Sequence, residues 1–184
     1  MEPTLTLPLK GNRVTLRDFR PEDIDAVYAY SSLPLVTRFT IWPPNTRTDA
    51  ERFVRASIDA VSKVPRRSFA LAIEGPVGGG VIGGARIGFQ AGSLDIGDIG
   101  YVLHPTFWGQ GLATEAVRLL VQFGWESLHL HRIEATCDPA NMGSRRVLEK
   151  VGFQYEGHLR QHIKVQGKWR DSLLFGLLAA DRSV

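Results

Sequence analysis

The chain has 184 residues, of which 43% are hydrophobic and 22% charged, the balance of a globular protein that can bury a core. Its net charge of +3 is too small to indicate a nucleic-acid-binding protein, although an anionic small molecule remains compatible. The single cysteine, Cys137, excludes an intrachain disulfide and suits a reducing compartment. Residues 1–14 do not resemble a signal peptide, and no apolar run could span a membrane, so we expect a cytoplasmic protein.

The first third of the chain predicts one strand and two helices. Residues 13–19 alternate apolar and polar side chains, as a strand does. A helix is expected over residues 20–32, with Pro21 near its start and acidic residues in its first turn. A second helix is expected over residues 48–64, where Thr48 and Glu51 have the spacing of a capping box. Between the helices, residues 33–46 are irregular and aromatic, and we expect them to form a wall of a pocket.

The middle of the chain predicts three strands, over residues 68–75, 81–89 and 94–103, that form an antiparallel meander. A glycine turn at residues 76–80 joins the first two. The third strand ends at His104-Pro105 and passes through Gly109-Gln110-Gly111 into a helix. On this helix Ala116, Leu119, Leu120 and Phe123 share one apolar face.

The last third predicts a strand over residues 132–138, a helix over residues 141–151 and two final strands. Gly152 is the expected C-cap of the helix, and Gln166-Gly167 the turn between the last strands. The fold class is therefore mixed α/β (α+β), with a largely antiparallel central sheet flanked by helices, in a single domain over residues 1–184. One right-handed parallel crossover is expected, from the strand before His104 to the strand over residues 132–138.

The Gly109-Gln110-Gly111 turn is suited to binding a phosphate group. A helix N-terminus has free backbone N–H groups and a partial positive charge, and residues without a Cβ allow a close approach. The alternative is a tight turn that needs glycine only for its dihedral angles. A P-loop is excluded because lysine and serine or threonine do not follow Gly111. A dinucleotide site would need a third glycine where Thr114 stands, although Glu134 or Asp138 could bind a ribose. A coenzyme A pyrophosphate site is the third class.

The stretches "YVLHPTFWGQGLATEA" and "NMGSRRVLEKVGFQYEG" together resemble the GNAT superfamily of N-acetyltransferases. The closer similarity is to the RimJ/RimL-type branch, which acetylates ribosomal-protein N-termini, and it extends over nearly the whole chain. Trp108 departs from the general pattern, which prefers Gln or Arg there, but Trp is common in this branch. The resemblance implies an acyl-CoA N-acyltransferase fold with one splayed parallel strand pair, acetyl-CoA as co-substrate, a primary amine as acceptor and a homodimer.

The resemblance also implies where acetyl-CoA binds. The backbone amides of residues 110–114 would hold the pyrophosphate, and the pantetheine arm would lie between the two splayed strands. Asn141 would cap its helix or bind the pantetheine, and Arg145 would reach the nucleotide phosphates or lie on a solvated helix face. The implied cofactor-binding residues are Leu103, Gly109, Gln110, Gly111, Leu112, Ala113, Thr114, Asn141, Ser144 and Arg145.

Three residues are candidates for catalysis. The backbone N–H near Leu103 would stabilise the oxyanion. Asp98 would act as the base, directly or through water; the alternative for Asp98, as for Asp95, is a solvated acid on the sheet. Ser144 would protonate or hydrogen-bond the leaving thiolate, or else simply bond its own helix.

Two further side chains have weaker claims to a role in the reaction. Tyr155 is a second candidate acid or a packed aromatic residue. Cys137 could form an acetyl-cysteine intermediate, but a small buried thiol is the commoner use of cysteine. The five histidines show no metal-binding spacing, so we expect no metal.

The sequence leaves the amine acceptor open. A protein N-terminal α-amine is the leading hypothesis, and a polyamine, an amino acid or an antibiotic amine are alternatives. From other classes, a non-catalytic acetyl-CoA-binding module and a nucleotide-dependent oxidoreductase are the competing hypotheses. We expect the acceptor pocket to be built from the segment from Phe39 to Trp42 and from the last strands.

Overall fold

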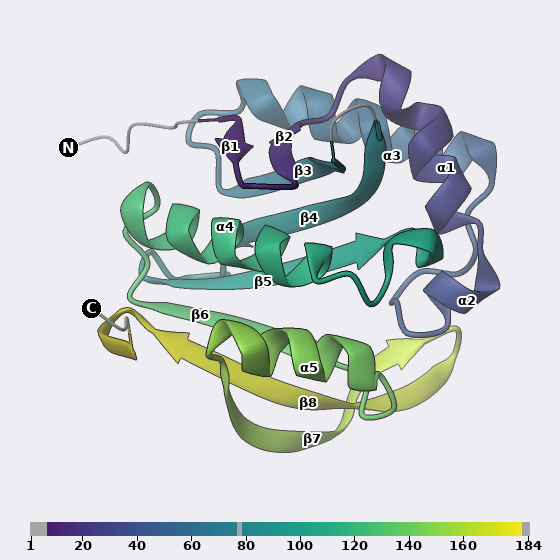
Figure 1. Cartoon of the computed structure of the whole chain (residues 1–184). Coiled ribbons are helices and arrows are strands. Elements are labelled where there is room, and N and C mark those ends of the chain that lie inside the picture. The colour runs from purple at the N-terminus through teal and green to yellow at the C-terminus, as the bar shows by residue number, and fades with distance from the viewer. Residues whose placement is uncertain (1–6, 77–78, 182–184) are drawn as a thin grey trace.

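A single mixed sheet organises the molecule, in the strand order β1-β2-β3-β4-β5-β6-β8-β7. The computed structural model describes residues 7–76 and 79–181, and Figure 1 shows the strands as a continuous twisted layer. The strands are β1 (Leu9–Lys10), β2 (Thr15–Asp18), β3 (Ser68–Glu74), β4 (Val81–Phe89), β5 (Ile96–Leu103), β6 (Arg132–Cys137), β7 (Gln154–Val165) and β8 (Lys168–Leu178). Each pair is antiparallel except β5 and β6.

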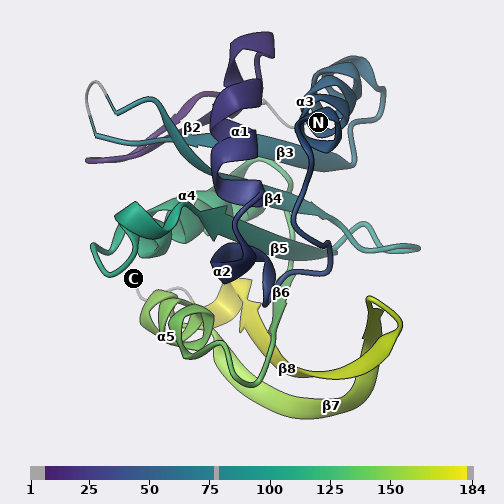
Figure 2. The same cartoon turned by 90° about the vertical axis from the view of Figure 1, so that its right-hand side faces the viewer.

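Helices cover both faces of the sheet, with α4 and α5 on one face and α1 and α3 on the other (Figure 2). The α-helices are α1 (Ile24–Ser31), α2 (Pro34–Thr37), α3 (Arg47–Asp59), α4 (Leu112–Glu126) and α5 (Met142–Val151). Short 3₁₀ helices lie at η1 (Pro21–Asp23), η2 (Ala60–Ser62), η3 (Pro105–Phe107) and η4 (Ala179–Asp181).

Side-chain alternation along the strands builds two hydrophobic cores. On one face, strand residues such as Ile99, Leu103 and Phe175 pack with Ala116 and Leu120 of α4. On the other face, a smaller core is formed by Phe19, Val27, Tyr30, Ala50, Val54 and Ala72. The α4 face that the sequence predicted is confirmed, because Ala116, Leu120 and Phe123 are buried and Leu119 packs beside them.

The fold class expected from the sequence is confirmed, as are the meander β3-β4-β5 and the parallel crossover from β5 through α4 to β6. Gly152 ends α5 with φ 111°, and Gln166 and Gly167 form the left-handed turn between β7 and β8. Of the predicted turn at residues 76–80, Val77 and Gly78 lie outside the described residues.

The predicted N-cap of the second long helix was wrong by two residues, and α3 ends at Asp59, before the predicted end at residue 64. Thr46, not Thr48, is the N-cap of α3, and Asp49, not Glu51, completes the capping box. The Asp49 amide donates to Thr46 Oγ1 at 3.2 Å, and the Thr46 amide donates to Asp49 Oδ2 at 2.9 Å. Aspartate can fill the place that glutamate usually takes, so two overlapping Thr-x-x-acid patterns competed in the sequence. Residues 33–46 also contain a short helix, α2, where we expected none.

The parallel pair β5 and β6 is joined over only three positions. The register runs from Ile96 opposite Arg132 to Asp98 opposite Glu134 and stops there. Beyond that point β5 continues along β4 to Leu103, and β6 continues along β8 to Cys137. The two strands therefore splay apart toward their carboxyl ends, as expected from the resemblance, and Figure 1 shows them diverging.

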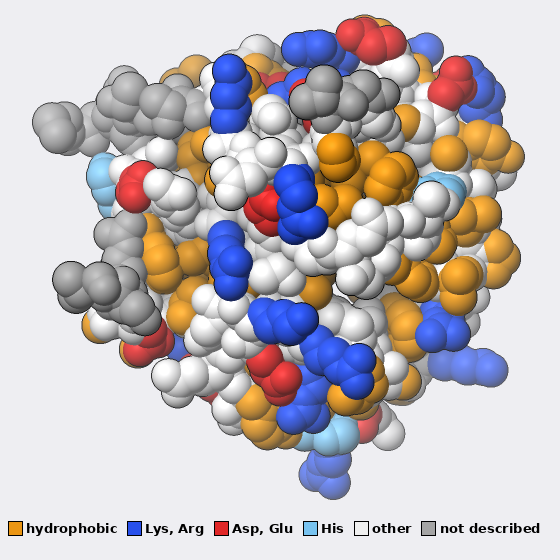
Figure 3. All heavy atoms as spheres, in the orientation of Figure 1, with side chains coloured by type: hydrophobic (Ala, Val, Ile, Leu, Met, Phe, Trp, Pro, Cys, Tyr) orange, Lys and Arg blue, Asp and Glu red, His pale blue; other side chains and the backbone are white. Residues whose placement is uncertain are grey.

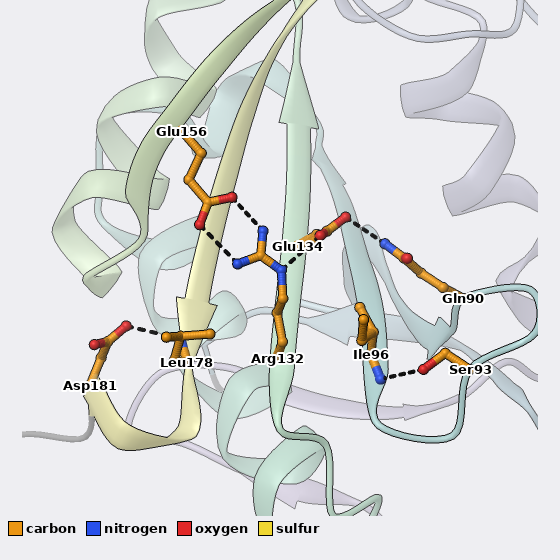
Figure 4. A network of polar contacts seen from close by, with 8 residues as sticks. All are labelled: Gln90, Ser93, Ile96, Arg132, Glu134, Glu156, Leu178 and Asp181. Atoms are coloured by element: carbon orange, nitrogen blue, oxygen red, sulfur yellow. Dashed lines mark hydrogen bonds and ion pairs between the residues drawn. The ribbon is translucent and has the colours of Figure 1, made fainter.

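A polar network reinforces the closed end of this splayed pair (Figure 4). Arg132 of β6 donates from Nε to Glu134 Oε1 at 2.7 Å and from Nη1 to Glu156 Oε1 of β7 at 2.8 Å. Gln90, just after β4, donates to Glu134 Oε2 at 2.5 Å, so this contact passes over β5. Gly176 of β8 provides the space for the Glu156 carboxylate, since a Cβ at this position would lie 2.3 Å from Glu156 Oε1. The network ties the two halves of the sheet together where the strands still pair.

Candidate active site

The turn between β5 and α4 presents an open helix N-terminus. Gly109 and Gly111 adopt φ of 74° and 78°, in the left-handed region that side chains disfavour. Gly111 is the N-cap of α4 and makes no side-chain cap, and the first intrahelical bond is donated by the Glu115 amide to the Gly111 carbonyl at 3.1 Å. The amides that precede Glu115 in this turn therefore lack an intrahelical acceptor. The glycines allow the left-handed dihedral angles of the turn. Because they have no side chains, they also leave these amides accessible.

Among the turn residues, Leu112 is buried with 1% of its surface exposed, and Ala113 and Thr114 line the same first turn of α4. Gln110 folds its side chain back, donating from Nε2 to the Thr106 carbonyl at 2.8 Å. Gln110 and Leu112 thus leave the turn with backbone rather than side-chain groups exposed, the arrangement that an anion site at a helix N-terminus requires.

Arg13 buttresses this turn from the far end of the sequence. Its Nη1 donates to the Gln110 carbonyl at 2.8 Å, and its Nε donates to Glu115 Oε2 at 3.2 Å. Glu115 Oε1 also accepts the backbone amides of Arg13 and Val14, at 2.7 and 3.3 Å. Although partial burial opposes it, these hydrogen bonds hold the pKa of Glu115 below its ordinary value. The sequence analysis did not point to Arg13, because 97 residues separate it from Gln110.

Backbone groups of β5 face the gap between the splayed strands. The His104 amide donates to the Ile82 carbonyl at 2.9 Å, which fixes the alternation of hydrogen bonds along β4 and β5. By that alternation, Tyr101 and Leu103 turn their N–H and C=O groups away from β4, toward β6. The Leu103 carbonyl accepts Trp108 Nε1 at 2.9 Å, which ties the turn to the strand end. The geometry therefore directs the Leu103 amide into the gap.

Ser144 lies on α5 across the gap from β5. Asn141 is the N-cap of α5, as predicted, and its Oδ1 accepts the Ser144 amide at 3.1 Å. The Ser144 hydroxyl is hydrogen-bonded to the Tyr101 hydroxyl at 2.9 Å, and Tyr101 is also placed to donate to the Ser144 carbonyl at 3.2 Å. The sequence analysis did not single out this side chain of Tyr101. Its position could have been found from strand alternation, which puts Tyr101 on the same face as Ile99 and Leu103.

Asp98 lies on the opposite face of β5 from Tyr101. Its Oδ2 forms an ion pair with Arg86 Nη2 of β4, and both side chains are partly exposed. Val102, with the same parity on the strand, packs with the core under α1 and α3. The two candidate catalytic side chains, Asp98 and Ser144, therefore stand on opposite faces of the sheet.

The segment from Phe39 to Trp42 is held to β8; that it lines an acceptor pocket stays a prediction. Arg170 of β8 donates from Nη1 to the carbonyls of Phe39 and Thr40, at 3.0 and 3.3 Å. Its Nε lies 3.4 Å from Asp138 Oδ2, at the end of β6. The open end of the splayed pair, the segment and β8 thus meet at one guanidinium group.

The two weaker catalytic candidates, Cys137 and Tyr155, differ in burial. Cys137 is 7% exposed, and burial together with the nearby Asp138 carboxylate raises the pKa of its thiol to about 11. Tyr155 is 51% exposed, with its ring edge against Phe175. Within residues 7–76 and 79–181, His, Cys, Asp and Glu side chains form no group of three or more that could hold a metal ion. Across the same ranges, none of the helices has the length and apolar character needed to cross a membrane.

Lys and Arg side chains gather on the face that carries α4 and α5 (Figure 3). They were scattered in the sequence, and the fold brings them together. Arg118 of α4 donates to the Lys150 carbonyl of α5 at 3.2 Å, and Arg145 is ion-paired with Glu149 at 2.8 Å. Arg13 is also half-exposed beside the open helix end, where it is ion-paired with Glu115.

Comparison with known proteins identifies this arrangement. The family model described as "Acetyltransferase (GNAT) domain" matches residues 13–154, which include the turn, the splayed strands and α5. The chain belongs to the GNAT acetyltransferase family. It is 36% identical over 173 residues to "Uncharacterized N-acetyltransferase p20" of Bacillus licheniformis, a match that covers 92% of this chain and 95% of that protein. Like its GNAT relatives, the chain is an N-acetyltransferase.

Other GNAT proteins resemble it in sequence and structure. The "[Ribosomal protein uS5]-alanine N-acetyltransferase" of Escherichia coli is 32% identical over 90 residues, which is 49% of this chain and 46% of that protein. The solved structure of "Mycobacterium smegmatis RimJ in complex with CoA-disulfide" superposes with a TM-score of 0.78 at 30% identity. That match covers 91% of this chain and 83% of the RimJ chain. The similarity to the RimJ/RimL-type branch inferred from the sequence is confirmed.

Proposed function

We propose that this GNAT protein transfers the acetyl group of acetyl-CoA to the N-terminal α-amine of a protein, by direct attack in a ternary complex. The observation that carries the proposal is the parallel pair β5 and β6, which stops after three positions beside an uncapped helix N-terminus. A diphosphate suits the open amides of the turn, and a pantetheine amide chain suits the unpaired groups of the gap. The RimJ relative with a bound CoA-disulfide supports coenzyme binding at this kind of fold.

The distribution of charged side chains supports the same placement of the coenzyme, with its phosphates near the turn. The Lys and Arg side chains that gather over α4 and α5 would attract the phosphates of CoA. In this proposal residues 110–114, Asn141 and Arg145 contact the coenzyme, and residues 1–184 act as one N-acetyltransferase domain. Because the co-substrate and a ribosomal acceptor both occur in the cytoplasm, the proposal assigns the protein to that compartment.

The chemistry divides between the two faces of β5. The amine nitrogen attacks the thioester carbonyl, the Leu103 amide stabilises the oxyanion, and the thiolate leaves toward Ser144. On the other face Asp98 takes up the proton of the amine, directly or through water. Holding both reactants in this geometry supplies the largest share of the rate, roughly 7–11 kcal/mol for well-oriented groups.

Mass spectrometry of acetylated products tests the proposal. Acetyl-CoA is offered with peptides that begin with Ala, Ser or Met, and with the same peptides blocked at the N-terminus but carrying an internal lysine. Peptides starting with Ala come first, because the uS5 enzyme's name specifies alanine. We expect acetylation of the free α-amine in the unblocked peptides. We expect no acetylation of the blocked peptides.

Other outcomes separate the alternatives. Acetylation of spermidine or free amino acids but of no peptide would contradict a protein acceptor and favour a small-molecule acetyltransferase. Binding of CoA in calorimetry without any acetylated product would favour a non-catalytic module. A homodimer is a further part of the proposal, drawn from the resemblance, and elution of the purified chain at monomer mass would contradict it.

A variant of Arg170 tests where the acceptor binds. Arg170→Ala removes the donor that fixes the Phe39 and Thr40 carbonyls, so the segment loses its attachment to β8. We expect the KM for the peptide to rise about tenfold, the value of roughly one charged hydrogen bond, with the KM for acetyl-CoA unchanged. Lys168→Ala, an exposed residue on the same strand, is the matched control and should leave both constants unaltered. Equal effects of the two substitutions would refute this acceptor site.

A further inference from the structure

One hydrogen-bonded pair of side chains bridges the splayed strand β5 and helix α5. The Tyr101 hydroxyl lies 2.9 Å from Ser144 Oγ and 3.2 Å from the Ser144 carbonyl oxygen. Tyr101 comes from the strand whose backbone faces the gap, and its ring packs against the core under α4. The contact therefore spans the opening in which the proposed function lays the pantetheine arm.

The position of Ser144 is fixed from two sides. Asn141 Oδ1 accepts the Ser144 amide at 3.1 Å and holds the backbone at the start of α5. That bond leaves the hydroxyl free to rotate about χ1, so it does not by itself aim the serine. The side-chain groups that hydrogen-bond the Ser144 hydroxyl are the Tyr101 hydroxyl, at 2.9 Å, and the Cys137 thiol of β6, and Tyr101 is the one that comes from β5.

The two hydroxyl groups can share their hydrogens in two ways. A tyrosine hydroxyl has one hydrogen, so Tyr101 donates either to the Ser144 carbonyl or to Ser144 Oγ. In the first arrangement, the serine hydrogen is directed at Tyr101. In the second, the serine hydrogen is released and can point into the gap. A negative sulfur in the gap favours the second arrangement, because it attracts that hydrogen.

We propose that Tyr101 is a positioning residue that holds the Ser144 hydroxyl so that its hydrogen faces the departing CoA thiolate. This inference rests on the proposed function. As the N–C bond forms and the C–S bond breaks, the electron pair of the C–S bond stays on sulfur, where the Ser144 hydroxyl donates a hydrogen bond to it. The amine proton passes to Asp98 or water on the other face, and the free thiolate takes its proton from solvent. Tyr101 keeps its own proton throughout, and burial, which raises the pKa of its phenol, favours that form.

A double-mutant cycle tests the inference, with turnover measured on the peptide that the wild-type chain acetylates. Tyr101→Phe keeps the ring and removes only the hydroxyl group. We expect kcat to fall about tenfold in Tyr101→Phe and about 100-fold in Ser144→Ala, with the KM for acetyl-CoA within twofold of wild type. Because Tyr101 acts through Ser144, the double variant should be no slower than Ser144→Ala alone.

The control is Tyr30→Phe, which removes a hydroxyl from a tyrosine that is 3% exposed in the core under α1. Its kcat should equal that of wild type, and thermal melting of all variants shows whether each is folded. Wild-type kcat in Tyr101→Phe, or losses that multiply in the double variant, would overturn the positioning role. A wild-type chain that acetylates nothing would instead contradict the proposed function, and this inference with it.

Discussion

At the scale of single residues, a buried ion pair lies away from the candidate active site. Arg17 of β2 holds Asp23 with two bonds, Nη1 to Oδ2 at 2.7 Å and Nη2 to Oδ1 at 2.9 Å. Asp23 is 4% exposed and also accepts the Arg20 amide at 2.7 Å. Burial by itself would raise the pKa of Asp23, but these bonds outweigh it and lower the pKa from the ordinary value of 3.8. The pair fixes the start of α1 on the sheet.

This pair gives a prediction about pH. A carboxyl group with a lowered pKa in the folded state stabilises the fold above its unfolded pKa, and the stabilisation is lost as pH falls through the folded value. Asp23→Asn removes the bidentate partner of the buried Arg17 and leaves it paired with Glu74 alone, so we expect a loss of about 3 kcal/mol in the free energy of unfolding at pH 7. The difference from wild type should narrow below pH 3.8. Urea unfolding from pH 7 to pH 2 measures both quantities.

Asp25 offers the matched control, because its side chain is 75% exposed and pairs with Arg47 on the surface. Asp25→Asn should cost less than about 1 kcal/mol at pH 7. A wild-type chain whose advantage over Asp23→Asn stays constant down to pH 2 would show that the carboxylate charge is not the cause.

The sequence analysis identified the roles of residues whose partners are close in the chain. It missed the roles of residues whose partners lie in distant segments. Asn141 was recognisable as an N-cap because a cap and its helix are adjacent in the chain. The roles of Arg13 and Arg170 were not visible, since their partners lie 97 and 131 residues away. Asp98 was recognised as a candidate base, but its pairing with Arg86 depends on the register between β4 and β5.

At the scale of elements, the helix α4 depends on the glycine that begins it. Gly111 has φ 78°, and a Cβ there would lie 3.3 Å from Arg13 Nη2. Gly111→Ala should therefore destabilise the protein by about 1–2 kcal/mol and raise the KM for acetyl-CoA. Gly143→Ala in the first turn of α5 is the control for stability, because its Cβ would meet only Asn141 Oδ1 at 3.5 Å. Equal melting temperatures for the two variants would contradict the strain argument.

Element types followed from the sequence because hydrophobic periodicity is a local signal. The end of α5 and the turn between β7 and β8 were both marked by glycine and both confirmed. The capping box of α3 was misplaced by two residues. The sequence holds two overlapping capping-box patterns, and local residues alone do not decide between them. The splay of β5 and β6 was expected only from family resemblance, since strand pairing is not encoded in either strand alone.

At the scale of the whole molecule, the sheet is two blocks joined at a short seam. The block β1 to β5 and the block β6, β8 and β7 share three paired positions, reinforced by the Arg132 network. A ligand lying in the gap would contact both blocks at once. Its binding free energy would then add to the stability of the whole fold.

We therefore expect acetyl-CoA at about 100 times its Kd to raise the melting temperature by about 5–10 °C. Hydrogen exchange should slow at the amides of Tyr101 and Leu103, because the pantetheine would occupy their side of β5. NAD at the same concentration is the control, and should change neither measurement. Stabilisation by acetyl-CoA with protection confined to other segments would refute binding in the gap.

The indole of Trp108 lies at the turn before α4. Its N–H is held by the Leu103 carbonyl, and 43% of the residue is exposed at the turn. A fluorophore beside the amides of the proposed pyrophosphate site should change its emission when a ligand occupies them. We therefore expect Trp108 to report coenzyme binding optically, and comparison with Trp108→Phe would isolate its signal from those of the other tryptophans.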